Sequence, residues 1–114
     1  MTELVDYARM VLLEDRSNAE ALYIMGVFEE KGIGKQPNKE ASFHYMTAAA
    51  RLEYTPALTR LGDYYYSGFY VEKNLENARL LYEKAAEKGE SQAVLNLALM
   101  LDKGLLPQGS HIGG

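Results

Sequence analysis

The sequence predicts an all-α solenoid of about two and a half helix-pair repeats, and three observations lead to this fold class. Small and apolar residues return at a fixed spacing, the segments between them have the period of amphipathic helices, and Gly, Pro and Asn stand where helices should begin and end. The chain has 114 residues and is 47% hydrophobic, which is enough for one domain with its own core.

A spacing of 36 residues relates three columns of small residues. The columns are Ala21, Ala57 and Ala93; Gly26, Gly62 and Ala98; and Gly32, Gly68 and Gly104. A second set matches at 37 residues, which we attribute to a shorter loop before Asn38. This set aligns Ala41, Tyr45 and Ala49 with Ala78, Tyr82 and Ala86. Recurring small and apolar positions predict stacked units that share a core.

Each unit is predicted to contain two helices, because apolar and small residues recur at i, i+3, i+4 and i+7. The first helices, called A, are expected at residues 18–31, 56–67 and 91–103. The second helices, called B, are expected at residues 38–52 and 74–88, and residues 2–14 form a B helix left over from a preceding unit. The repeats therefore lie near 21–56 and 57–92 with a partial one at 93–104, inside a domain of residues 1–106; residues 107–114 are a loop or disordered tail.

Residues with special backbone roles agree with these limits. Thr55 before Pro56 is predicted to cap a helix, and Ser17 to Glu20 fits a capping box. Further N-caps are expected at Asn38, Asn74 and Ser91. Glycines that can close a last helical turn are Gly32, Gly68, Gly89 and Gly104. Glycine within a helix costs about 1 kcal/mol relative to alanine, so Gly26 and Gly62 are predicted to permit close helix approach.

Residues 57–93 resemble a Sel-one-like repeat, a relative of the tetratricopeptide repeat. The resemblance rests on the run ALTRLGDYYYSG from Ala57 to Gly68, followed by Val71, Asn74, Ala78, Leu81, Tyr82 and Lys84-Ala85-Ala86. Residues 21–56 match less well, since Glu29 replaces a tyrosine and His44 a tryptophan, and residues 93–104 match a first helix only. The resemblance implies a right-handed α-solenoid of antiparallel helix pairs that acts as an adaptor.

By analogy with tetratricopeptide arrays, the A helices line a concave face that binds a partner. The predicted partner-binding residues are Tyr23, Val27 and Glu30 in the first unit, Thr59, Asp63 and Tyr66 in the second, and Leu95, Leu99 and Asp102 in the third. We expect them to receive an extended or helical protein segment with basic and apolar side chains. The alternative is that the acids are solvated helix faces and that Leu95 and Leu99 pack against a missing B helix.

Other partners and cofactors find little support in the composition. A net charge of −4 disfavours nucleic acid and anionic membranes. The sequence shows no signal peptide and no run long enough to insert into a membrane, so a soluble protein is expected, with the compartment unknown. Without cysteine there is no disulfide or thiolate zinc site, and no cofactor is expected. Self-association through the truncated C-terminal repeat is a further expectation.

Candidate catalytic groups are few, and each has a simpler interpretation. His44 falls at the tryptophan position of a B helix, which favours packing, and His111 lies in the tail. The GIGK run at residues 32–35 lacks the full spacing of a phosphate loop. The acid clusters at 29–30 and 87–90 are interpreted as solvated surface. No catalytic or metal-binding residue is therefore predicted.

The sequence thus predicts a non-enzymatic scaffold or adaptor, a fragment of a longer repeat protein. The alternative is a structural repeat module that packs against another domain, catalytic or not, of a longer polypeptide.

Overall fold

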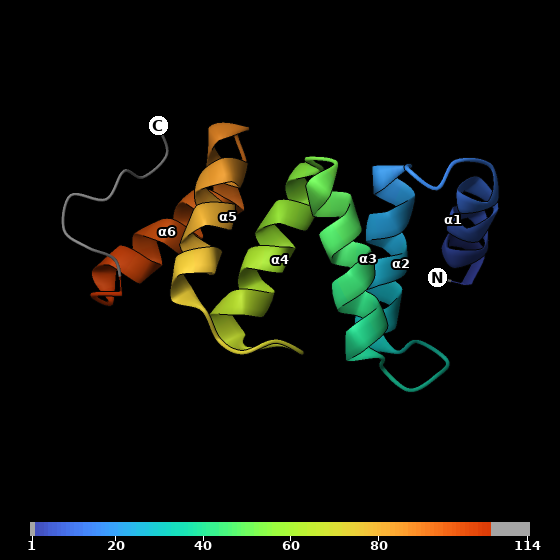
Figure 1. The fold of residues 1–114 in the computed structure, drawn as a ribbon, viewed down its shortest axis with the longest axis horizontal. Helices are drawn as coiled ribbons and strands as arrows, with labels where there is room; N and C mark the ends of the chain where they lie inside the picture. The colour runs from blue at the N-terminus through green and yellow to red at the C-terminus, as the bar shows by residue number, and fades with distance from the viewer. Residues whose placement is uncertain (1, 106–114) are drawn as a thin grey trace. The chain divides into compact units, whose positions relative to one another are not determined.

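The computed structural model describes residues 2–105, which fold into six helices (Figure 1). They are α1 (Thr2–Glu14), α2 (Ala19–Lys31), α3 (Lys39–Arg51), α4 (Thr55–Ser67), α5 (Leu75–Glu87) and α6 (Ser91–Asp102). Each predicted helix is present, and each predicted end lies within one residue of the observed end. No strand occurs between residues 2 and 105. The predicted tail at 107–114, including His111, lies outside the described residues.

The described chain divides into two compact units between Ala57 and Leu58, within α4. Unit 1, from residue 2 to 57, contains α1, α2 and α3, and unit 2, from 58 to 105, contains most of α4 with α5 and α6. In unit 1, α2 packs against both α1 and α3, whereas in unit 2 α5 packs against α6. None of the helices in this range is both long and apolar enough to cross a bilayer.

One cluster of the unit 1 core joins a face of α1 to a face of α2. Val5 and Ala8 of α1 are buried against Ala21, Met25 and Phe28 of α2. These residues follow the spacing of about one helical turn that places side chains on a common face. In unit 2, buried residues come from all three helices: Leu58, Leu61 and Tyr64, then Ala78, Tyr82 and Ala85, then Ala93, Leu97 and Met100.

Two helix glycines allow a large side chain from the next helix to lie directly over the backbone. A Cβ atom at Gly26 would lie 2.7 Å from Cε of Met46, and one at Gly62 would lie 2.6 Å from Cε1 of Tyr82. Ser42 adds a buried hydrogen bond from its hydroxyl to the carbonyl oxygen of Gly26 at 2.8 Å. The predicted role of these glycines in close helix approach is therefore confirmed.

The two glycine contacts correct the predicted register of the B helices. Met46 and Tyr82 are 36 residues apart, as are the N-caps Asn38 and Asn74, whose side chains accept from the backbone N–H three residues on at 3.0 Å. The 37-residue alignment was wrong because it matched Tyr45 with Tyr82 by residue type, although it is Met46 that fills the same place in the packing.

In the repeat at residues 57–93, Leu81 occupies the position of the family's tryptophan. In the corrected register the residue equivalent to Leu81 is Tyr45, not His44. The imidazole of His44 is mostly exposed, and its Nε2 lies 3.9 Å from Glu40 Oε2. The predicted packing role of His44 was therefore wrong.

The helix starts differ in detail from the prediction. Asn18, not Ser17, caps α2, and its side chain accepts from the N–H of Ala21 at 2.9 Å. The predicted N-cap Ser91 is the first helical residue of α6, and the residue before it, Glu90, makes no capping hydrogen bond with its side chain. Thr55 likewise belongs to the first turn of α4 instead of preceding it.

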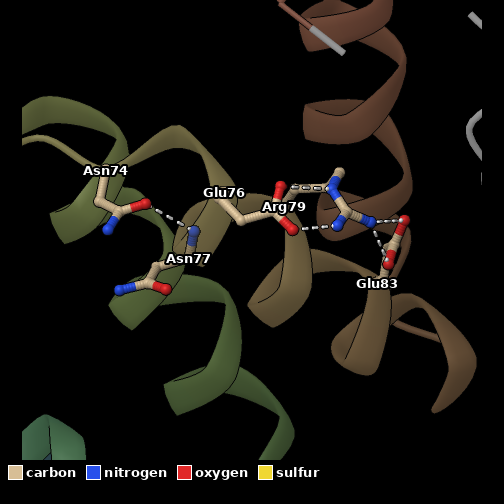
Figure 2. Close-up of polar contacts among 5 residues, drawn as sticks. All are labelled: Asn74, Glu76, Asn77, Arg79 and Glu83. Atoms are coloured by element: carbon tan, nitrogen blue, oxygen red, sulfur yellow. Dashed lines mark hydrogen bonds and ion pairs between the residues drawn. The ribbon is translucent and has the colours of Figure 1, made fainter. Parts of the chain in front are cut away.

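The exposed side of α5 carries an ion-pair cluster, shown in Figure 2. Arg79 binds Glu83 through Nη1 at 2.9 Å and also pairs with Glu76 one turn earlier. The hydrogen bond from Arg79 lowers the pKa of Glu76. Because both acids lie within four residues of the arginine, the cluster supports the helix locally.

Candidate functional site

A groove in unit 2 unites parts of α4, α5 and α6. It has a volume of about 170 Å³ and is lined by Asp63, Tyr66, Tyr82, Asn96, Leu99, Met100 and Lys103. We call it the unit 2 groove. Three of its residues, Asp63, Tyr66 and Leu99, were predicted to bind a partner, and they come from two consecutive A helices.

Hydrogen bonds fix the carboxylate of Asp63 at the groove. Its Oδ1 accepts from the hydroxyl of Tyr82 and from Nδ2 of Asn96, the latter at 3.3 Å. Asn96 is oriented in turn by Gln92, whose Nε2 donates to Asn96 Oδ1 at 3.0 Å. Although these bonds hold it, Asp63 remains exposed to solvent. The acid is thus a pre-oriented hydrogen-bond acceptor at the surface.

The Tyr82 hydroxyl stays protonated at neutral pH. Burial raises the pKa of Tyr82, and the neighbouring carboxylate of Asp63 raises it further because an ionised phenol would repel it. The hydroxyl is therefore a permanent donor to Asp63. Since the ring of Tyr82 lies over Gly62, the same side chain links the packing of α5 on α4 to the position of the acid.

The remaining walls of the groove are apolar and aromatic, with one cation. Leu99 is exposed and Met100 is buried on α6, and Tyr66 of α4 is half-buried. Lys103 is exposed at the end of α6. The groove can therefore contact the apolar body of a side chain while its polar end reaches a carboxylate.

The structure separates the other predicted residues. Tyr23 and Val27 line a smaller groove of about 130 Å³ in unit 1 with Leu4 and Ile24. The ring of Tyr23 lies 5.4 Å from that of Tyr54. Glu30 is half-buried, whereas Leu95 and Asp102 are exposed; none of these three lines either groove.

Thr59 is placed differently from the other candidates. It is only 7% exposed, and its hydroxyl has no hydrogen-bond partner among residues 2–105. A buried hydroxyl without a partner costs free energy, because its hydration is lost without replacement.

Four residues of the unit 2 groove were not predicted from the repeat spacing: Tyr82, Asn96, Met100 and Lys103. A signal for three of them was present. Residues 96, 99, 100 and 103 follow the i, i+3, i+4, i+7 pattern, so they share one face of α6 with the predicted Leu99.

Two of the weaker chemical candidates pair with each other. Glu29 is 8% exposed and forms an ion pair with Lys35 of the GIGK run. Its interpretation as solvated surface was wrong, because the loop after α2 folds back and brings the lysine to it. Within residues 2–105 no three His, Asp or Glu side chains gather in a way that could hold a metal ion.

Comparison with known proteins gives a consistent result. The family model of the Sel1 repeat matches twice, at residues 19–54 and 55–90. The chain is 29% identical to protein sel-1 homolog 2 of Rattus norvegicus over 97% of its length and 17% of that protein's. It is also 29% identical to the Mus musculus homolog over 91% and 15% of the two lengths. It therefore spans less than a fifth of these relatives.

A solved structure supports the same family. The crystal structure of a Sel1 repeat protein from Oxalobacter formigenes superposes with a TM-score of 0.74 at 27% identity, covering 88% of this chain and 37% of that one. Together with the six helices, this likeness confirms the predicted fold class, an all-α solenoid of helical repeats. The right-handed sense of the array stays a prediction.

Proposed function

This chain belongs to the Sel1 repeat family, and we propose that it acts as an adaptor that holds a segment of another protein in the unit 2 groove. Sel1 repeats in general are protein–protein interaction modules, and proteins built from them are typically non-catalytic scaffolds. The adaptor role, the absence of catalysis and the origin of this chain as a fragment of a longer repeat protein are our proposals.

The arrangement around Asp63 is the observation that carries the proposal. Tyr82 and Asn96 both donate to the same carboxylate oxygen, so the acid is held in one orientation before any partner arrives. Pre-orientation reduces the conformational entropy that binding must overcome. Tyr66 and Leu99 beside it offer rigid aromatic and apolar contact area, as expected at the centre of an interface.

The partner segment is proposed to carry basic and apolar side chains. A lysine or arginine can bind the carboxylate of Asp63 while its alkyl stem lies along Leu99 and Tyr66. The net charge of −4 favours the approach of a basic segment. Lys103 at the rim disfavours a second cation nearby, which sets a limit on the charge density of the segment.

A binding comparison tests this function. Fluorescence anisotropy with an array of labelled basic–apolar 15-residue peptides identifies a binder, and the variant Asp63→Lys with Tyr66→Ala is then measured against it. Loss of a charge-assisted contact and of aromatic area should weaken binding by about tenfold or more. Glu72→Lys is the matched control, since Glu72 is exposed in unit 2 and outside the groove. Unchanged affinity in a folded Asp63/Tyr66 variant would remove the groove from consideration.

A second role is supported by the exposed apolar face of α6. Ala98 is equivalent to Gly62 and Gly26 in the repeat, but no helix covers it among residues 2–105, and the neighbouring Leu95 and Leu99 are exposed. This face is suited to pack against further repeats or another domain, or against a second copy. Light scattering of the wild type and of Leu95→Asp tests self-association: a monomer in both cases would argue against the second copy.

A further inference from the structure

A second and larger groove lies in unit 1 and has the opposite polarity. Its volume is about 600 Å³, and its lining comes from α1 and the turn that follows it, from α2, and from α3. The lining residues are Arg9, Leu12, Leu13, Arg16, Leu22, Met25 and Tyr45. We call it the unit 1 groove. Protein sites of this volume commonly bind ligands or partner side chains through an apolar surface with a few polar groups.

The floor of the unit 1 groove is apolar, and an exposed leucine extends the apolar surface to its rim. Leu22 and Met25 of α2 are buried at the base, and Leu12 is half-buried. Leu13 at the rim is 85% exposed, the highest value among the exposed large apolar residues of the described range 2–105. Single exposed leucines are common on protein surfaces, but this one borders a concave apolar surface that a partner could extend.

Two arginines and no carboxylate line the groove, although the chain as a whole is acidic. Arg16 has neither an ion pair nor a hydrogen-bond partner in the described range 2–105, and the hydroxyl of Tyr45 has no hydrogen-bond partner there. Arg9 contacts Asp6 at 3.6 Å, but both side chains are largely exposed, and an exposed pair of this kind is weak. The groove thus presents cationic donors next to apolar surface.

The spacing of the arginines restricts what they can bind together. Arg9 lies in α1 and Arg16 in the turn just after it, seven residues on. Only the part from Arg9 to Glu14 is helical, with a rise of about 8 Å along the axis, and Arg16 lies two residues beyond the helix end, so the two arginines are separated by on the order of 10 Å. Two carboxylates at the same separation occur on one face of a helix at positions i and i+7, with apolar residues at i+3 and i+4 between them.

We propose that the unit 1 groove binds an amphipathic helix of another protein that carries two acidic residues two turns apart beside an apolar stripe. The apolar stripe packs on Leu12, Leu13 and Met25, and the two carboxylates bind Arg9 and Arg16. This partner is opposite in charge to the one proposed for the unit 2 groove. The two sites are therefore independent, and failure of one leaves the other standing.

The test uses 18-residue synthetic helical peptides with a leucine face and a pair of glutamates placed three, seven or eleven residues apart, with a lysine version of the seven-residue peptide. Anisotropy is measured with the whole chain. We expect the seven-residue glutamate peptide to bind most tightly, about tenfold more tightly than its lysine counterpart, and to weaken as salt is raised. The double variant Arg9→Glu, Arg16→Glu should lose about tenfold or more in affinity.

Matched controls separate a site from general attraction. Arg51→Glu with Lys31→Glu makes the same change in net charge at exposed positions outside the groove and should change affinity by less than about twofold. Leu13→Asn should weaken binding, whereas Met10→Asn, an exposed apolar residue of the same helix outside the lining, should not.

Three results would overturn the proposal. The first is equal affinity for the glutamate and lysine peptides. The second is an equal loss of peptide affinity in the Arg9/Arg16 variant and in its charge control. The third is binding of dodecanoate through the arginines while no peptide binds. The last result would assign the groove to a small anionic amphiphile.

Discussion

Replacing Gly62 with alanine is expected to destabilise the chain, although alanine is the better helix former. The substitution gains about 1 kcal/mol in helix propensity. However, the new Cβ would lie 2.6 Å from Cε1 and 2.8 Å from Cδ1 of Tyr82, so the ring must move. Tyr82 is buried and bonded to Asp63, and overpacking of this kind costs about 1–3 kcal/mol. We expect a net loss of about 1 kcal/mol.

Two companion substitutions separate propensity from packing. At Gly26 the close atom is the terminal methyl of Met46, which can rotate away, so Gly26→Ala should change the free energy of unfolding by about 0.5 kcal/mol or less. Ala98 is exposed, so Ala98→Gly should lower the free energy of unfolding only by the difference in helix propensity between alanine and glycine, about 1 kcal/mol. Urea denaturation followed by circular dichroism measures all three. A Gly62→Ala chain as stable as wild type, or a larger loss at Gly26, would refute the reasoning.

Further predictions concern single polar groups. Ser42→Ala should lower the free energy of unfolding by about 1 kcal/mol, because the buried hydrogen bond from Ser42 to the carbonyl oxygen of Gly26 is lost. Thr59→Val should raise the free energy of unfolding by about 1 kcal/mol, because an unpartnered buried hydroxyl is removed. Urea denaturation measures both variants, and a Ser42→Ala chain more stable than wild type would contradict the prediction for Ser42. Burial and a nearby carboxylate raise the pKa of Tyr82, so stability should be complete below about pH 10 and fall as the pH rises and unfolded tyrosines ionise. Tyr82→Phe should reduce the decrease in the free energy of unfolding with pH, measured by denaturation at several pH values above 9. An unchanged pH dependence would contradict this prediction. Arg79→Gln should raise the pKa of Glu76 in an NMR titration, since its hydrogen bond is lost; no change would show the pair to be broken in solution.

Helix positions could be predicted from the sequence because periodicity and end residues agree. Asn38 and Asn74 both cap helices where expected, and each is followed by a regular apolar face. The register within the B helices was predicted wrongly, because Tyr45 resembles Tyr82 in type while Met46 replaces it in position, although the predicted N-caps Asn38 and Asn74 are 36 residues apart. Residue type is a poor guide where a flexible side chain fills the same space as a ring.

The candidate site was predictable only in outline. The repeat placed Asp63 and Tyr66 on one helix face, but the contact of Asp63 with Tyr82 joins residues 19 apart, and its existence depends on how closely α5 approaches Gly62. The unit 1 groove had no signal of its own, since its lining comes from α1, the turn after α1, α2 and α3. Such surfaces follow from packing geometry, which a local pattern does not contain.

The residue that fills the space above the helix glycine differs between the two repeats, and so does the outward-facing residue that follows the glycine. In unit 2 the filler is Tyr82, whose hydroxyl supports an acid at Asp63; in unit 1 it is Met46, which has no donor, and the equivalent outward position is Val27. The buried residue over the glycine and the exposed residue after the glycine therefore vary together between the two repeats. Exchanging both residues of the pair between the repeats should move the acidic or the apolar exposed surface from one repeat to the other. Exchanging one residue alone should not.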